Sequence, residues 1–299
     1  MIEVEGLTKQ YGRTVAVDDL SFTVEPGRVT GFLGPNGAGK STTMRMMLAL
    51  DRPTAGRALI DGQPYGAFAE PLRKVGAVLE ARSTHGGRRC RDHLLWLAHT
   101  NRIPVSRVDE VLELVGLASV ARRRVKGFSL GMHQRLGLAA ALLGDPPVLL
   151  LDEPVNGLDP EGIVWLRNLM RKLAAEGRTV FVSSHLMSEM ALTAEHLVVI
   201  GRGRLLADTT VERFIAANTK SYVRIATPEP GRLREVLTGE GIQVTDTEDG
   251  ALAAHGADPA RVGELVAAHG VVVHEIAQRS ASLEEAFVQL TGNSVEFGR

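Results

Sequence analysis

Aromatic residues, cysteine and long apolar runs are all scarce in this sequence of 299 residues. Phe, Trp and Tyr make up 4% of the chain and the formal net charge is -1, so neither base stacking nor a basic surface indicates a nucleic-acid partner. The single cysteine, Cys90, has no partner for an internal disulfide, which fits a reducing cytoplasm. No apolar run approaches the roughly 18 residues of a membrane span, and the acidic, alternating start is unlike a signal peptide. We therefore expect a globular chain that binds no nucleic acid and reaches a membrane only through a partner.

Two domains are expected from the length and from a change of composition along the chain. From residue 220 onward, 12 acidic residues outnumber 7 basic ones. The pattern there predicts strand, helix, hairpin, helix and strand, and a last helix that begins at a capping box from Ser282 to Glu285. This β-α-β-β-α-β order is typical of a ferredoxin-like domain. We expect a first domain over residues 1–218 and a small C-terminal α+β domain over 219–299, with a regulatory or dimer-supporting role.

The strongest motif is the stretch GPNGAGKST, which follows the apolar run VTGFL and precedes the helical pattern MRMMLAL. A strand, a loop with the spacing G-x-x-x-x-G-K-S and a helix are the context of a phosphate-binding loop. Backbone N–H groups of such a loop surround phosphate oxygens, Lys40 reaches the β- and γ-phosphates, and the Ser41 hydroxyl ligates Mg²⁺. The predicted nucleotide-binding residues of the loop are Gly34, Pro35, Asn36, Gly37, Ala38, Gly39, Lys40, Ser41 and Thr42.

Two acidic residues follow a second apolar run, VLLLDEP, which predicts a strand buried on both faces of a parallel sheet. Asp152 ends this strand at the edge where α/β ligand sites lie, and we expect it to help hold Mg²⁺. The neighbouring Glu153 is the candidate general base for an attacking water. A third run, TVFVSSH, brings His185 to the same edge if the sheet is parallel, although a lone histidine is more often structural. The sequence thus predicts an α/β P-loop fold in which Glu153 is the candidate general base, while a functional and a structural role both stay open for His185.

The order of these motifs resembles that of the nucleotide-binding subunit of an ATP-binding-cassette (ABC) transporter. FSLGM stands between the phosphate loop and the acidic strand, and NGLD follows that strand. The resemblance covers about residues 1–215. It implies ATP and Mg²⁺ as cofactors, ATP hydrolysis, and a head-to-tail homodimer that holds two ATP molecules between its subunits. It also implies a separate transmembrane permease, with this chain bound peripherally at the cytoplasmic face of the cell membrane.

The resemblance implies that His185 is catalytic, as a sensor of the γ-phosphate, and it adds further candidate site residues. FSLGM aligns with the family's signature, so Ser129 and the N–H of Gly131 would meet the γ-phosphate bound by the partner subunit. Tyr11 matches the aromatic residue that stacks on adenine, and Asp159 matches the loop that couples the two sites. On the residues alone, FSLGMHQR is also an ordinary helix start and Tyr11 a surface aromatic.

Three positions depart from the family pattern. Leu130 stands where glycine is usual, and Met132 stands where glutamine is common. Glu80 stands where a lid loop normally carries a glutamine that contacts Mg²⁺; a carboxylate is still an oxygen ligand for this cation, but a solvated loop acid is the alternative. The combination of GAVLE with SLGM is similar to bacterial exporters of antibiotics and antimicrobial peptides. It implies export of a drug-like or peptide substrate.

A mostly helical pattern separates Glu80 from Ser129, and the resemblance identifies about residues 84–143 as the subdomain that leans against the permease. The basic residues of this region face either phospholipid, an acidic segment of the permease or simply solvent. They are Arg88, Arg89, Arg91, Arg122, Arg123, Arg124 and Lys126. Four large apolar residues are expected in the core, namely Trp96, Met44, Met46 and Met47.

Two other functions stay open on the sequence. The first is a soluble P-loop enzyme that transfers phosphate to a small acceptor, in which the signature and NGLD would have no use. The second is a cassette ATPase that acts on DNA or ribosomes, which usually has paired cassettes or a long coiled coil. Neither of those features is visible in the sequence.

Overall fold

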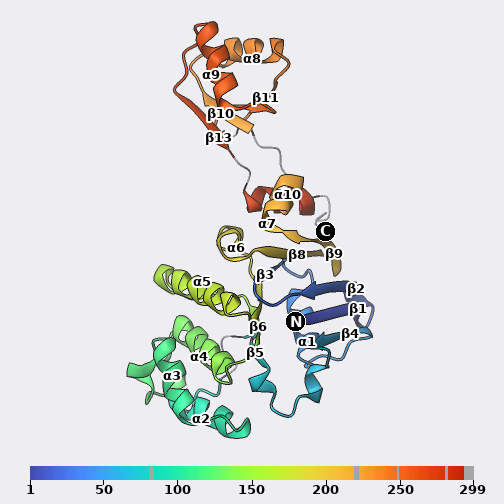
Figure 1. Ribbon diagram of the computed structural model, residues 1–299, viewed down its shortest axis with the longest axis vertical. Helices are drawn as coiled ribbons and strands as arrows, with labels where there is room; N and C mark the ends of the chain where they lie inside the picture. The colour runs from blue at the N-terminus through green and yellow to red at the C-terminus, as the bar shows by residue number, and fades with distance from the viewer. Residues whose placement is uncertain (81–83, 219–221, 248, 280–281, 293–299) are drawn as a thin grey trace. The chain divides into compact units, whose positions relative to one another are not determined.

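The computed structural model describes residues 1–80, 84–218, 222–247, 249–279 and 282–292, and these form two compact units (Figure 1). The first unit spans Met1–Val211 and the second begins at Glu212. The division falls at the start of α7 (Val211–Asn218). Thr219, where we expect the second domain to begin, lies outside the described residues. Among the helices described, none combines the length and the apolar character needed to cross a membrane.

A six-stranded sheet in the order β5-β6-β7-β3-β8-β9 lies at the centre of the first unit. Its strands are β3 (Val29–Leu33), β5 (Val75–Val78), β6 (Val148–Asp152), β7 (Thr179–Ser183), β8 (His196–Gly201) and β9 (Arg204–Thr210). All neighbours pair in parallel except β9, which is antiparallel to β8. Every residue of β3, β6 and β7 is buried, because both faces of the sheet are covered. The predicted parallel sheet is confirmed, and the carboxyl ends of these three strands meet at one edge.

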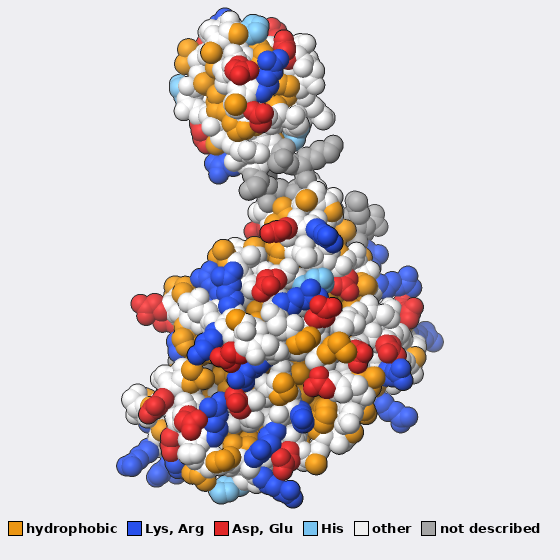
Figure 2. Space-filling view, in the orientation of Figure 1, with side chains coloured by type: hydrophobic (Ala, Val, Ile, Leu, Met, Phe, Trp, Pro, Cys, Tyr) orange, Lys and Arg blue, Asp and Glu red, His pale blue; other side chains and the backbone are white. Residues whose placement is uncertain are grey.

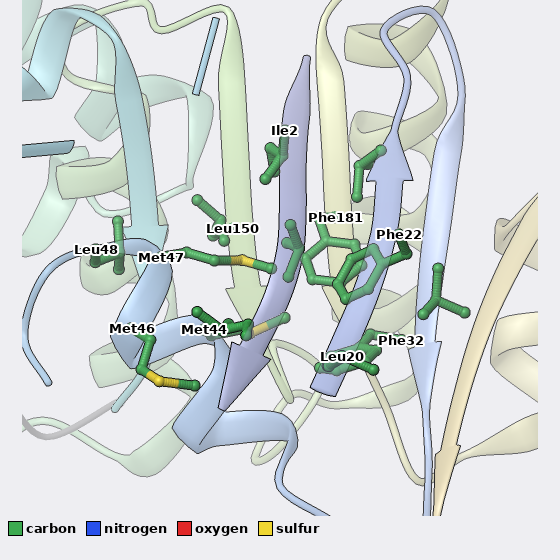
Figure 3. Packing of buried hydrophobic residues seen from close by; sticks show 14 of the residues in the cluster. Ile2, Leu20, Phe22, Phe32, Met44, Met46, Met47, Leu48, Leu150 and Phe181 are labelled. Carbon is green, nitrogen blue, oxygen red and sulfur yellow. The ribbon is translucent and has the colours of Figure 1, made fainter. Parts of the chain in front are cut away.

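One face of this sheet packs against a smaller antiparallel sheet in the order β2-β1-β4. Its strands are β1 (Ile2–Tyr11), β2 (Thr14–Val24) and β4 (Ala55–Ile60). Helix α1 (Lys40–Met47) contacts β2 and β4 of this sheet and β6 of the larger one. The rings of Phe22, Phe32 and Phe181 point toward one another in the shared core, with centroids 4.9 to 5.7 Å apart (Figure 3). Each buried Phe contributes about 1.5 to 3 kcal/mol through burial. The three methionines of α1 lie in this core as predicted.

The other face of β6 is covered by α4 (Leu130–Leu142) and α5 (Pro160–Ala175). In the chain, α4 follows α2 (Cys90–Thr100) and α3 (Ser106–Leu114), while α6 (Met187–Thr193) follows β7. The prediction that Trp96 is buried is wrong, because this residue is 49% exposed. Helix α2 buries the stripe formed by Cys90, Leu94 and Ala98, and Trp96 lies off that stripe beneath the guanidinium of Arg88, 4.5 Å from the ring centroid.

The second unit contains a four-stranded antiparallel sheet in the order β11-β12-β10-β13. After α7, its elements are β10 (Tyr222–Ala226), α8 (Pro230–Gly239), β11 (Gln243–Asp246), β12 (Leu252–His255), α9 (Pro259–Ala268), β13 (Glu275–Arg279) and α10 (Leu283–Gly292). Apolar side chains of α8, α9, β10 and β12 share one core. The run VVVHEIAQ predicts that the last strand begins at Val271, but the strand begins at Glu275, because the Val271 N–H donates to the Val266 carbonyl oxygen and closes α9. Ser282 and Glu285 form the predicted capping box.

Candidate functional site

The phosphate loop joins the carboxyl end of β3 to the amino end of α1. Gly37 (φ +81°) and Gly39 (φ +105°) adopt left-handed conformations that glycine accepts without steric cost. At Gly39 a Cβ atom would lie 2.5 Å from the carbonyl oxygen of Ala16, so a larger residue would push the loop away from β2. These turns place the loop at the positive end of the α1 dipole, which favours an anion.

A cleft of about 240 Å³ lies between the phosphate loop and the end of β6. Its lining consists of Ala16, Asn36, Gly37, Ala38, Gly39, Lys40, Ser41, Thr42, Asp152 and Glu153. Seven of the nine predicted loop residues and both predicted carboxylates therefore meet in one place. The other two loop residues, Gly34 and Pro35, contact the site through Lys40.

Lys40 is buried in the wall of this cleft. Its Nζ donates to the carbonyl oxygens of Gly34 at 2.6 Å and Pro35 at 3.2 Å. Burial lowers the pKa of Lys40, and the negative charges of Glu153 and Asp152 oppose that shift. A phosphate group in the cleft offers the ammonium a charge-assisted partner that is stronger than the neutral carbonyls.

Ser183 connects the two acidic residues at the end of β6. It pairs with Asp152 in the register of β6 and β7, and its hydroxyl donates to the Asp152 carboxylate. The same oxygen accepts a hydrogen bond of 2.9 Å from the Glu153 N–H. Ser183 is a site residue that the sequence analysis missed. The available signal was its position as the last residue of a strand parallel to β6.

The Glu153 carboxylate faces His185. Glu153 Oε2 lies 2.7 Å from His185 Nδ1 and accepts a hydrogen bond of 3.2 Å from the His185 N–H. Glu153 also has φ +49°, which is uncommon for a residue with a side chain and is characteristic of strained active-site positions. The contact engages Nδ1 and not Nε2, so one ring nitrogen orients the imidazole while the other is left for a ligand. The structure thus brings His185 to the strand edge that carries the acidic pair.

Tyr11 and Glu80 lie outside the cleft lining. The Tyr11 hydroxyl donates to Asp51 at 3.0 Å, Lys9 Nζ lies 4.8 Å from the ring centroid, and the residue is 48% exposed. Partial burial and the contact with Asp51 raise the pKa of Tyr11. The exposed Glu80 follows β5; after the larger effects of Asp51, its charge contributes to the raised pKa of Arg45 on α1. An exposed ring held by its hydroxyl is suited to stacking on a base.

The signature residues also lie outside that lining. Ser129 is exposed and caps α4, since its hydroxyl accepts from the Met132 N–H at 3.2 Å. Asp159 caps α5 by accepting from the Gly162 N–H at 3.1 Å. Ser129, Gly131 and Asp159 are all absent from the cleft that holds Lys40. Within one chain, the signature and the phosphate loop therefore do not share a pocket.

The donor set at the cleft fits Mg²⁺ bound together with a nucleotide. Ser41 and Asp152 both line the cleft, whereas Glu80 does not. No group of three or more His, Cys, Asp or Glu suited to a metal occurs among the described residues. Mg²⁺ commonly takes one or two protein oxygens and completes its shell with phosphate oxygens and water, so a hydroxyl and one carboxylate suffice.

Comparison with known proteins gives the family. Residues 17–156 match the family model described as ABC transporter, and residues 221–284 match a domain of unknown function. The chain is 38% identical over 300 residues to the bacitracin transport ATP-binding protein BcrA of Bacillus licheniformis, with 98% of this chain and 97% of that protein covered. The chain belongs to the ABC transporter family. It is also 35% identical over 208 residues to the lantibiotic transport ATP-binding protein SrtF of Streptococcus pyogenes, covering 70% of this chain and 90% of that one.

The fold of this ABC subunit is shared with solved cassettes. A dimeric ATP-binding cassette in a post-hydrolysis state, bound to ADP and Pi, superposes with a TM-score of 0.64 over 70% of this chain and 98% of that chain, at 24% identity. The predicted P-loop fold and family are confirmed. The chain is an ATP-binding, ATP-hydrolysing transporter subunit, and the two alternative functions lose their support.

Proposed function

We propose that this ABC subunit powers export of an antibiotic of the bacitracin or lantibiotic class through a separate transmembrane permease. The observation that carries the proposal is the similarity to BcrA, which extends over 98% of this chain and therefore includes the C-terminal unit. The similarity to SrtF covers 70% of the chain. The sequence pair GAVLE and SLGM points to the same class of exporters. In this proposal the subunit binds peripherally at the cytoplasmic face of the membrane.

Resistance measurements test this function. When the chain is produced together with the membrane protein encoded beside it in a sensitive bacterium, the minimal inhibitory concentration of bacitracin or of a lantibiotic should rise. The matched control is Lys40→Ala, which removes the ammonium that contacts the phosphates and should abolish the gain. Equal resistance with Lys40→Ala, or no gain for either class from a complex that is assembled in the membrane, would contradict the proposal.

The exposed surface of α2 supports the permease as partner. The exposed Trp96 of α2 pairs through a cation–π contact with Arg88, which lies just before the helix. Trp combines a large apolar area with a polar N–H, as residues at interfaces commonly do. Figure 2 shows basic, acidic and apolar side chains interspersed over the visible face. We propose that the permease contacts the helices α2 to α4. Loss of co-purification with the permease on Trp96→Ala would support this placement.

For hydrolysis we propose a head-to-tail homodimer with two composite sites. The phosphate loop, Ser41 and Asp152 of one subunit hold ATP and Mg²⁺, and Ser129 and Gly131 of the other subunit approach the γ-phosphate. Support comes from the exposed Ser129 at a helix amino terminus and from its absence from the cleft of its own chain. Glu153 accepts the proton of the attacking water, and His185 contacts the γ-phosphate.

The C-terminal unit is proposed to be an accessory domain that is not required for nucleotide binding. It has its own sheet and its own apolar core. A truncated protein that ends at Asn218 should therefore fold and bind ATP with an affinity within about threefold of the full chain. Equilibrium titration with a fluorescent ATP analogue measures this, with circular dichroism as the folding control. A folded truncation without nucleotide binding would show that the second unit contributes to the site.

A further inference from the structure

Two segments that carry proposed site residues contact each other within one chain. Helix α4 begins at Leu130, directly after its cap Ser129, and Gly157 lies in the loop between Glu153 and Asp159. A Cβ atom on Gly157 would lie 2.4 Å from Cγ and 2.6 Å from Cδ2 of Leu130. The leucine side chain therefore occupies the space that any side chain at position 157 would need.

The backbones of the two segments are close as well. A Cβ atom on Gly131 would lie 2.6 Å from the carbonyl oxygen of Gly157. Gly157 has φ +80°, a left-handed conformation that presents this carbonyl at a turn of the loop. Glycine at both positions lets the first turn of α4 lie directly against the loop, and Leu130 fills the remaining gap.

Arg135 joins the same helix to the far end of the loop. Its guanidinium lies 5.0 Å from the ring centroid of Trp165 on α5, and Nη2 lies 3.9 Å from the Asp159 carboxylate. Nη1 donates to the carbonyl oxygen of Val115 at 3.1 Å. The apolar contact of Leu130 with Gly157 and the ionic contact of Arg135 with Asp159 start about one and a half turns apart on α4. Together they resist rotation of the helix relative to the loop.

We propose that Leu130 and Gly157 are a matched pair of positioning residues, which fix the first turn of α4 against the loop so that Ser129 and Asp159 meet the partner subunit as one rigid unit. Leu130 is 41% exposed, which places it at the surface beside the exposed Ser129. The family signature usually has glycine at this position, whereas here the leucine side chain packs against Gly157. The inference rests on the proposed role of Ser129 in the composite site.

The test is a double-mutant cycle with ATP hydrolysis as readout. Gly157→Ala should lower kcat by about 10- to 10²-fold, because displacement of a positioned group by about 1 Å has effects of that size. ATP affinity of the monomer should stay unchanged, since the phosphate loop is not touched. Adding Leu130→Gly removes the side-chain atoms that the new methyl group at position 157 would meet. The kcat of the double variant should therefore recover to within about threefold of that of Leu130→Gly alone.

Gly177→Ala is the matched control, because Gly177 also has a left-handed φ of +90° but nothing lies within 4 Å of its Cβ position. It carries the backbone strain without the contact and should keep kcat near the wild-type value. A Gly157→Ala variant no slower than Gly177→Ala, or one that Leu130→Gly does not rescue, overturns the pairing. A separate variant tests the composite site on which this inference rests. If Ser129 has no role in that site, Ser129→Arg will leave ATP-dependent dimerisation intact.

Discussion

Glu153→Gln should slow ATP hydrolysis by about 10²- to 10⁴-fold while ATP still binds. The amide is close in size to the carboxylate but does not accept a proton from water. It retains an oxygen that can accept from the His185 N–H, so the local backbone should be preserved. Phosphate release under steady-state conditions measures turnover, and equilibrium titration with a fluorescent ATP analogue measures binding.

The same variant should accumulate a long-lived ATP-bound dimer, because hydrolysis is the step that reopens it. Analytical ultracentrifugation with and without ATP and Mg²⁺ detects this species. Glu161→Gln is the matched control, since it makes the same chemical change at an exposed residue in the first turn of α5. Turnover of Glu153→Gln within about threefold of the wild type would remove Glu153 from the role of general base.

Ser129→Arg should abolish ATP-driven dimer closure while monomer affinity for ATP stays nearly unchanged. A cation at the amino end of α4 opposes the helix dipole, and its bulk stands where the γ-phosphate of the partner's ATP would lie. The phosphate loop of the same chain is unaffected because Ser129 does not line its cleft. If ATP binding is kept while dimer closure is lost, Ser129 contacts the nucleotide that the partner subunit holds.

Mixed dimers give the sharper experiment. When one Ser129→Arg chain pairs with one Lys40→Ala chain, contacts across the interface put both defects in one composite site and leave the other site intact. If all contacts stay within a chain, both sites are damaged. Closure around a single ATP per mixed dimer supports the shared site. Complete loss of closure, with both single-variant homodimers folded, would reject it.

Local patterns were enough to predict the central strands of the first unit. VTGFL, VLLLD and TVFVS became strands at the predicted residues because continuous apolar runs of this length are stable only between two covered faces. GPNGAGKST was recognised as the phosphate loop because the spacing G-x-x-x-x-G-K-S between a strand and a helix is specific to such loops. In the second unit the order of strands and helices was predicted, whereas the ferredoxin-like classification and the regulatory role stay predictions.

Exposure of single residues was harder to predict. The size of Trp96 predicts a core residue, but the buried face of α2 is formed by the smaller side chains of Cys90, Leu94 and Ala98. Glu80, Tyr11 and Asp159 were proposed through the family pattern, and the structure places each outside the cleft that the phosphate loop forms. Their roles toward ATP and the partner subunit remain proposals, because those roles concern molecules other than this chain.

The sequence by itself predicted the phosphate loop and the acidic pair, because each of these two motifs is encoded within about ten consecutive residues. Only the tertiary structure decided which distant residues support them. Ser183 fixes Asp152 through the register of two strands, His185 meets Glu153 across the sheet edge, and Leu130 lies on Gly157. These pairs are separated by some 30 residues of chain, so their contact depends on how strands and helices pack and not on any local pattern.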